Sequence, residues 1–278
     1  MAPKNKLLFG TAGVPQSSLK KTTLEGLREI KRLGLDCLEI EFVQGVKMGV
    51  DTAQQVGEEA EKLGLSVSVH APYYVSLNSP RQGIRMTSHK RLLRSARIAR
   101  ILGARTVVFH PGYYGNKTPE DTFKTIKEGL KEVVSILNSQ RNPVVLRPET
   151  MGKRSQFGSL EEILFLCQEV EGLKPCIDFS HLHARYGKAN DYLSFHRILN
   201  KIKLKLGMEA LKQMHIHVSG ILYGNKGEIK HLMLDKSDFR YDELMQALKD
   251  FQVKGTVIIE SPTQEKDALM LKNLYHSS

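Results

Sequence analysis

Residues 24–42 read LEGLREIKRLGLDCLEIEF, and this stretch shows the unit from which the chain is built. Apolar residues recur at a spacing of three from Leu24 to Leu33, which is typical of a helix with one apolar face. Gly34 follows at the place where a glycine most readily ends a helix. The run DCLEIEF then predicts a strand.

The same order of helix, glycine and strand returns along the chain. Helical spacing over 53–63, 92–99 and 123–137 precedes the strand-like runs LSVSVH (65–70), RTVVFH (105–110) and PVVLRPE (143–149). Four further runs are predicted as strands: LLFG (7–10), KPCIDF (174–179), KQMHIHV (212–218) and GTVIIE (255–260). Eight strands that alternate with helices, in units of about 35 residues, predict one α/β domain over residues 1–278. We expect a single eight-stranded parallel (β/α) barrel, the TIM barrel.

Composition narrows the class of protein. Forty-one Lys and Arg against 30 Asp and Glu give a net charge of +11, which favours a polyanionic partner. The absence of Trp counts against a base-stacking, single-strand binder. Three cysteines among apolar neighbours, with neither a signal peptide nor a membrane-spanning run, predict a reducing, cytoplasmic location without membrane contact.

One segment has no clear helix or strand pattern. Residues 219–238 are rich in Gly and Lys and follow the seventh predicted strand. A loop of this length inside a compact domain is usually functional. We therefore expect this irregular segment to contribute to the site.

Six predicted strands end in residue types that bind metals. These are His70, His110, Glu149, Asp178 with His181, His215 with His217, and Glu260. The carboxyl ends of the strands meet at one rim of a barrel, where converging imidazoles and carboxylates are costly without a cation. Mixed His and carboxylate ligands suit zinc best, with manganese or iron as alternatives.

The number of ligands indicates more than one ion. Glu149, Asp178, His215 and Glu260 would satisfy a single zinc, which leaves the other strand-end histidines unexplained. Paired ions clamp the attacking and leaving oxygens of a phosphoester displacement. Together with the basic charge, this pattern predicts hydrolysis of a nucleic-acid phosphodiester.

Six blocks of sequence resemble the signature blocks of the endonuclease IV family. The blocks are VHAPYYVSLNSP (69–80), VVFHPG (107–112), RPETMGK (147–153), CIDFSHLHA (176–184), MHIHVSG (214–220) and VIIESP (257–262). Members of that family are zinc-dependent apurinic/apyrimidinic (AP) endonucleases of base-excision repair with a xylose-isomerase-like TIM barrel. The resemblance runs from Phe9 to Pro262. It implies hydrolysis of double-stranded DNA 5′ to an abasic site, and we expect a monomer.

The resemblance also implies a ligand set for two or three zinc ions. His70, His110 and Glu149 would hold the first ion. Glu149 would bridge to a second, held by Asp178, His215 and Glu260, and the carboxylates Glu149, Asp178 and Glu260 would serve catalysis. His181 and His231 would hold the third ion.

The chain departs from the family pattern at the third ion. The family usually has an aspartate two residues before the histidine that matches His231, and Ile229 stands there instead. Glu228 is the candidate replacement ligand. His217 has no inherited role, and we assign it a structural one.

Other residues are candidates for contact with DNA. Tyr73 and Tyr74 lie in a loop that the family inserts into the minor groove beside the abasic gap, where wedge side chains stabilise a kinked duplex. Strand-end lysines suit phosphate contacts, namely Lys153, Lys226 and Lys230. Glu39 and Glu41 share one face of their strand and are interpreted as polar rim residues.

Two other functions compete with this one. A sugar isomerase or epimerase on the same barrel would use Glu149, Asp178, His215 and Glu260 for a single ion. It would not need the remaining histidines as ligands, and a basic chain suits a neutral sugar poorly. A non-catalytic DNA-binding protein would have no reason to keep the bridging Glu149.

Overall fold

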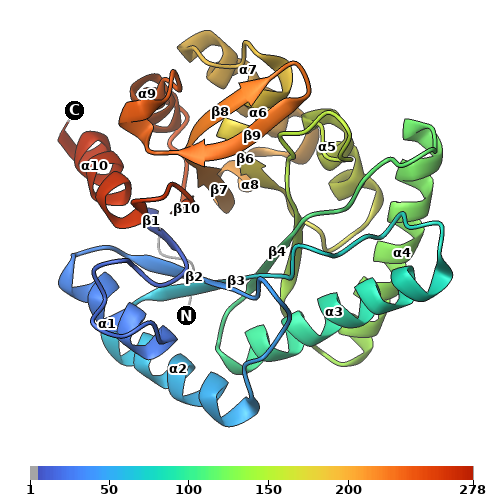
Figure 1. Cartoon of the computed structure of the whole chain (residues 1–278), viewed down its shortest axis with the longest axis horizontal. Helices are drawn as coiled ribbons and strands as arrows, with labels where there is room; N and C mark the ends of the chain where they lie inside the picture. Colours follow the sequence, from blue (N-terminus) through green and yellow to red (C-terminus); the bar gives the residue numbers. More distant parts are fainter. Residues whose placement is uncertain (1–5, 278) are drawn as a thin grey trace.

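Each predicted unit of helix and strand forms one segment of a barrel (Figure 1). The computed structural model describes residues 6–277. The barrel strands are β1 Leu7–Ala12, β2 Cys37–Glu41, β3 Ser66–His70, β4 Thr106–Phe109, β5 Val145–Pro148, β6 Cys176–Asp178, β7 Met214–Val218 and β10 Gly255–Ile259. The helices are α1 Thr23–Arg32, α2 Val50–Leu63, α3 Gln82–Ile101, α4 Pro119–Ser139, α5 Leu160–Glu169, α6 Phe179–Tyr186, α7 Tyr192–Leu206, α8 Met208–Leu211, α9 Tyr241–Asp250 and α10 Gln264–Ser277.

The eight strands form one parallel sheet that closes on itself. Their order is β5-β4-β3-β2-β1-β10-β7-β6, and each neighbouring pair in that order is parallel. A parallel bridge between Glu149 and Cys176 joins the end of β5 to β6. The predicted TIM barrel is confirmed. The ends of the six strands predicted to carry metal-binding residue types lie at the same rim.

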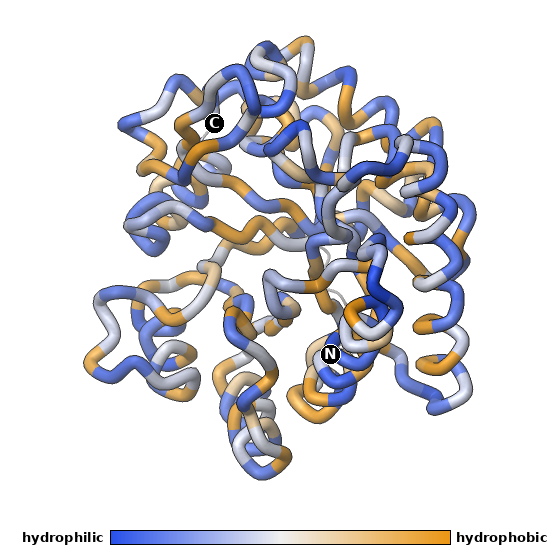
Figure 2. The backbone as a smooth tube through the Cα atoms, turned by 45° about the vertical axis from the view of Figure 1, so that its right-hand side comes forward, coloured by the Kyte–Doolittle hydropathy of each residue, from blue (hydrophilic) through white to orange (hydrophobic). Residues whose placement is uncertain are grey.

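Local sequence explains the helices around the barrel. In α1 the hydroxyl of Thr22 accepts a hydrogen bond from the amide of Glu25, while Leu27 and Ile30 are buried. Gly34 then takes a φ of +72°, a left-handed conformation that glycine adopts without strain. Figure 2 shows hydrophobic and hydrophilic segments alternating along the outer helices, as expected when one face packs on the strands.

Hydrophobic side chains inside the barrel are few. Leu8, Cys37 and Ile258 form a small apolar cluster, separate from the large core between strands and helices. Fully buried charged or polar residues face the remaining interior, among them Glu39 and His217. Branched apolar layers usually fill such a barrel, so buried charge at this density points to a functional interior.

The segment after β7 is more regular than the sequence indicates. It forms an antiparallel hairpin of β8 Gly220–Gly224 and β9 Gly227–Leu232, followed by the short helix η1 Leu234–Lys236. The expectation of an irregular loop is therefore wrong for 220–232. The hairpin packs on α6. Among residues 6–277, none of the helices combines the length and apolar character that a bilayer crossing requires.

Candidate metal centre

The strand ends bring metal-binding residue types to one rim. They form three groups in which one candidate ligand atom per residue lies within 4.8 Å of the others. The groups are His70, His110 and Glu149; Glu149, Asp178, His217 and Glu260; and His181, Glu228 and His231. Because Glu149 belongs to two groups, these two adjoin.

In the first group, one carboxylate faces two histidines. Oε2 of Glu149 lies 3.2 Å from Nε2 of His70 and 3.1 Å from Nε2 of His110. Burial by itself raises the pKa of the Glu149 carboxyl, but His110 and His217 lower it well below its usual range. The group thus offers an ionised carboxylate oxygen and two imidazole nitrogens, a donor set that suits zinc.

The second group contains buried polar atoms that have close neighbours but no hydrogen-bond partner among the described residues. Nδ1 of His217 lies 3.2 Å from Oε1 of Glu260 and 3.5 Å from Oε1 of Glu149. Burial raises the pKa of Asp178 to about 7. Three buried atoms have no hydrogen-bond partner within residues 6–277, namely Glu149 Oε1, Asp178 Oδ2 and His217 Nδ1. Buried polar atoms are normally satisfied, and a cation held by these three would satisfy them, so the residues fit a metal ion.

The structure reverses the roles predicted for His215 and His217. Asp178 is paired in register with His217, whereas His215 is paired with Cys176, two residues lower in the barrel. Two residues along a strand span about 6.6 Å, so His215 is too deep to join Asp178 and Glu260. The prediction of His215 as a ligand beside these carboxylates is therefore wrong, and His217 is the histidine that lies among them.

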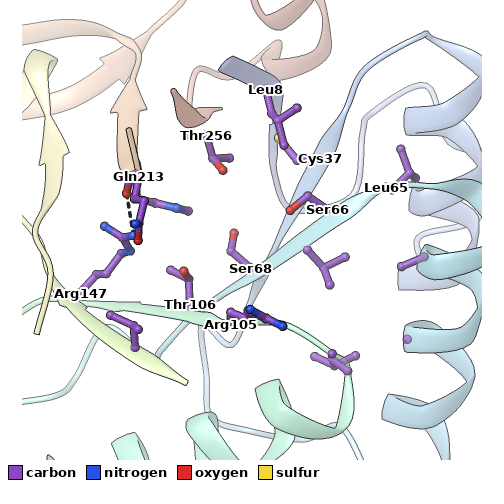
Figure 3. Close-up of a pocket in the computed structure, with 18 of the residues that line it drawn as sticks. Leu8, Cys37, Leu65, Ser66, Ser68, Arg105, Thr106, Arg147, Gln213 and Thr256 are labelled. Carbon is purple, nitrogen blue, oxygen red and sulfur yellow. Dashed lines mark hydrogen bonds between the residues drawn. The ribbon is translucent and has the colours of Figure 1, made fainter. Parts of the chain in front are cut away.

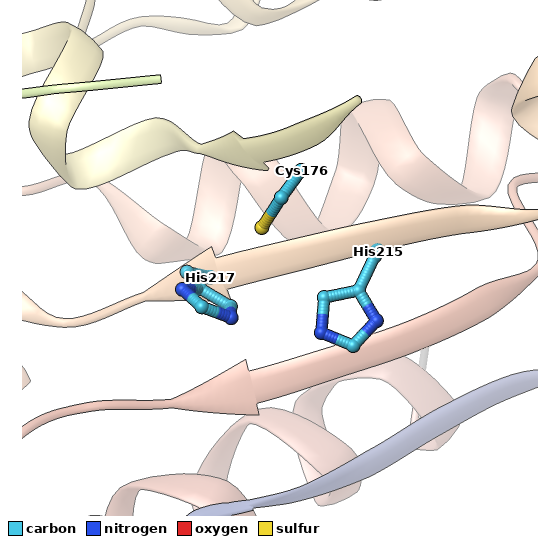
Figure 4. A group of neighbouring side chains, drawn as sticks. All are labelled: Cys176, His215 and His217. Atoms are coloured by element: carbon cyan, nitrogen blue, oxygen red, sulfur yellow. The ribbon is translucent and has the colours of Figure 1, made fainter. Parts of the chain in front are cut away.

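A further trio lies deeper in the barrel. Cys176 on β6 and His215 and His217 on β7 point toward one another in Figure 4, close enough to hold an ion. However, Nε2 of His215 donates a hydrogen bond to Oε2 of Glu39 at 2.8 Å, and Nε2 of His217 lies 2.8 Å from the other oxygen of Glu39. Glu39 therefore already engages both imidazoles, through a hydrogen bond with His215 and a close contact with His217.

The third group joins α6 to the hairpin. Nε2 of His181 lies 3.3 Å from Nε2 of His231 and 3.5 Å from Oε2 of Glu228. Glu228 Oε1 lies 3.8 Å from Nε2 of His231, while the side chain of Ile229 is 59% exposed. The structure thus brings the predicted replacement, Glu228, to the two histidines.

A β-bulge places Glu228 there. In the hairpin Leu222 pairs with Lys230 but Tyr223 pairs with Glu228, so Ile229 is an extra residue without a partner. An extra residue shifts the alternation of side chains by one, which lets Glu228 and His231 share a face although they are three apart.

Two glycines let this hairpin approach the loop after β5. A Cβ at Gly227 would lie 2.1 Å from the carbonyl oxygen of Gly152, and a Cβ at Gly152 would lie 2.7 Å from Cβ of Glu228. The close approach allows the amide of Glu228 to donate a hydrogen bond to the Gly152 carbonyl at 3.2 Å. Side chains at either glycine would displace Glu228 from His181 and His231.

The predicted DNA-contacting residues lie around the same rim. Tyr73 and Tyr74 are 48% and 44% exposed, and the Tyr73 ring stacks on His110 at 5.4 Å between centroids. Lys153 is bridged to Gly227 at the foot of the hairpin, and Lys226 and Lys230 are exposed on it. Tyr73 thus contacts a candidate ligand, and the two hairpin lysines belong to the element that carries Glu228 and His231.

The sequence interpretation missed two features of the site. Glu39 is completely buried beside His217, and Glu41 is half-buried with its pKa raised to about 8 by desolvation, so neither is a simple rim residue. The alternation in β2, which directs residues 39 and 41 inward, was the available signal.

A barrel that gathers histidines and carboxylates at the carboxyl ends of its strands defines a (β/α)8 protein with a candidate metal centre. This chain belongs to the xylose isomerase-like TIM barrel family, which it matches over residues 27–274.

Several relatives carry the name endonuclease 4. A probable endonuclease 4 of Bacillus velezensis is 32% identical over 210 residues, covering 72% of this chain and 68% of the relative. An uncharacterized protein of Methanocaldococcus jannaschii is 44% identical over 271 residues, covering 97% of both chains. The predicted resemblance to the endonuclease IV family is thereby confirmed.

Solved structures share the fold. Endonuclease IV from Thermus thermophilus superimposes with a TM-score of 0.73 at 21% identity, covering 98% of both chains. A D-tagatose 3-epimerase-like protein superimposes with a TM-score of 0.74 at 18% identity, covering 97% of this chain and 96% of the other. At such identities the likeness establishes the barrel and leaves the activity to the site.

Proposed function

We propose that this protein is a zinc-dependent AP endonuclease that hydrolyses the DNA phosphodiester 5′ to an abasic site in base-excision repair. One observation carries the proposal: three groups of candidate ligands lie at one rim, and the first two share Glu149. A mononuclear site would use one group and leave the others as buried histidines and carboxylates without purpose.

Each group would hold one ion. The first would take His70, His110 and Glu149, the second Glu149, Asp178, His217 and Glu260, and the third His181, His231 and Glu228. When bound, zinc would supply positive charge for the reacting phosphate and lower the pKa of attacking water. The carboxylates of Glu149, Asp178 and Glu260 would hold the ion in place, which fixes where that charge lies.

The rim residues would select the substrate. Tyr73 and Tyr74 are exposed, amphipathic side chains beside His70 and would enter the minor groove as wedges. Lys226 and Lys230 on the hairpin would contact backbone phosphates on the other side of the centre. An abasic nucleotide has no base pair to lose, so it would leave the duplex at low cost and reach the centre.

A sugar epimerase or isomerase is the second candidate. The group of Glu149, Asp178, His217 and Glu260 is by itself sufficient for one ion. That function gives no role to the His181, Glu228 and His231 group, which the bulge and two glycines bring together.

Zinc content and incision distinguish the two candidates. We expect zinc-loaded protein to contain more than one ion per chain and to cut a duplex carrying a tetrahydrofuran abasic site on its 5′ side. His70→Ala and His231→Ala should each reduce the zinc content and slow incision by at least tenfold. His196→Ala, an exposed histidine on α7, is the matched control and should change neither.

A different result would favour the second candidate. One zinc per chain, unaltered by His231→Ala, together with an intact abasic duplex, would contradict the endonuclease proposal. Epimerisation of a ketose by the same preparation would then identify the function.

A further inference from the structure

A cavity opens at the amino-terminal end of the barrel, opposite the candidate metal centre. Its volume is about 530 Å³, and residues near the starts of the strands line it, including Leu8, Ser66, Thr106 and Thr256 (Figure 3). Cavities of this size accommodate small organic molecules. The candidate metal ligands end the strands at the other rim, so this cavity is a separate feature.

A buried arginine lies in the wall of this cavity. Arg147 on β5 is only 7% exposed. Its Nη1 donates to the carbonyl of Pro175 and its Nη2 to the carbonyl of Gln213, both at 2.8 Å. Its Nε has no hydrogen-bond partner within the described part of the chain. No aspartate or glutamate in that part forms an ion pair with Arg147.

An unpaired buried cation requires an explanation. Removing a charged group from water without a counter-ion is unfavourable, and the cost is normally offset by an opposite charge. Burial accordingly lowers the pKa of Arg147 to about 10. Two of the five N–H donors of the guanidinium are used, so the group retains donors for another acceptor.

Both basic and acidic residues line the cavity around Arg147. Lys174 is half-buried beside it and donates to the side chain of Gln213, and Arg105 lies exposed at the edge. Lys212 also lines the cavity but is paired with Glu209 at 2.6 Å. The cavity's carboxylates, Glu58 and Glu61, come from α2 and are exposed.

Further polar atoms could hold an anion near Arg147. Thr106 and Ser66 are half-buried in the lining and point into the space in Figure 3. A smaller cavity of about 220 Å³ on the other side also has Arg147 and Lys174 in its wall. Both cations therefore line open space at this end of the barrel.

We propose that this cavity is a binding site for a small organic anion, whose phosphate or carboxylate group lies against Arg147. The planar guanidinium binds either group through paired N–H donors. Lys174 adds a second positive charge, and the apolar strand starts accommodate the rest of the molecule. The site is independent of the activity proposed for the metal centre.

Isothermal titration of the zinc-loaded protein tests the proposal. The probes are inorganic phosphate and, separately, acetate. We expect the protein to bind one of them saturably, and Arg147→Met to raise the Kd at least tenfold. Arg94→Met replaces an exposed arginine of α3 and should leave the Kd unchanged.

A second variant guards against misfolding of Arg147→Met. Thr106→Met would narrow the cavity without altering Arg147 and should weaken binding by a similar factor. If the two cavity variants, Arg147→Met and Thr106→Met, lose phosphate binding, the site takes a phosphate group. If they lose only acetate binding, the site takes a carboxylate group. If wild type and all variants bind both anions equally, binding is at the metal centre and the proposal is overturned. Absence of binding to the wild type at millimolar concentration overturns it as well.

Discussion

At the scale of single residues, Glu39 determines how His217 meets the metal centre. The buried Glu39 carboxylate contacts His215 and His217, and accepts a hydrogen bond from Ser68 at 2.6 Å. Burial by itself raises the pKa of Glu39, but the two histidines lower it well below its usual range. An ionised Glu39 beside Nε2 of His217 leaves Nδ1 to face Glu149 and Glu260.

We expect Glu39→Gln to weaken metal binding without removing any proposed ligand. Carboxylates that orient a metal-binding histidine typically contribute 10–100-fold to affinity. Competition with a chelator would measure the zinc Kd of each variant. Glu39→Asp should recover part of the affinity, and Ser68→Ala should have a smaller effect because it leaves both histidine contacts intact. Unchanged zinc affinity in Glu39→Gln would show that Glu39 has only a packing role.

The choice between His215 and His217 was beyond sequence reasoning. Both lie on the same face of β7, so alternation cannot separate them. The decision depends on the register between β6 and β7, which aligns Asp178 with His217 through contacts 39 residues apart. Glu149 and Glu260 were predictable because each directly follows a strand.

At the scale of elements, the bulge in β9 compensates for a departure from the family's spacing. The family pattern has its carboxylate two residues before the histidine, and here Glu228 precedes His231 by three. The extra residue, Ile229, is exposed and unpaired, so it is accommodated without moving Glu228 from the site.

Deletion of Ile229 should therefore be tolerated. The shortened strand would have regular alternation, with Glu228 again on the face of His231. We expect this deletion to retain the zinc content and incision rate within about a factor of three. Glu228→Gln, which keeps the bulge but removes the charge, should lower both. If the deletion loses zinc as Glu228→Gln does, Glu228 is not placed by the bulge as described.

The barrel strands were predictable for a reason that does not extend to the hairpin. Buried strands such as β4 and β10 are short apolar runs that local sequence reveals. Strand β9 has the sequence GEIKHL, and its residues Ile229 and Lys230 are both exposed. Its stability comes from pairing with β8 and packing on α6, which local sequence does not encode.

At the scale of the whole molecule, Asp36 connects the first strand to the last helix. Its carboxylate accepts hydrogen bonds from the amide of Phe9 at 3.2 Å, from Lys6 at 3.1 Å and from Lys272 of α10 at 2.8 Å. Lys272 also donates to the carbonyl of Gly34 at 2.7 Å. The contact thus holds together segments 236 positions apart, where the barrel joins its two ends.

Stability should depend on pH through this carboxylate. Burial by itself raises the pKa of Asp36, but Lys272, the Phe9 amide and Lys6 lower it below its usual value. A carboxyl with a lowered pKa stabilises the fold above the unfolded-state pKa of about 3.9, and this contribution disappears as pH falls through the folded-state value. Asp36→Asn should therefore lower the free energy of unfolding by about 1.5–3 kcal/mol at pH 7, the range for hydrogen bonds to a charged group.

Urea unfolding of wild type and Asp36→Asn at several pH values between 7 and 3.5 would measure this difference. It should be constant above about pH 5 and begin to shrink near pH 4, because protonation makes the wild-type side chain resemble the amide. Glu128→Gln, on the exposed face of α4, should differ little from wild type throughout. A difference that stays constant down to pH 3.5 would mean that the loss comes from packing or from the amide itself. Barrel closure would then not depend on the charge of Asp36.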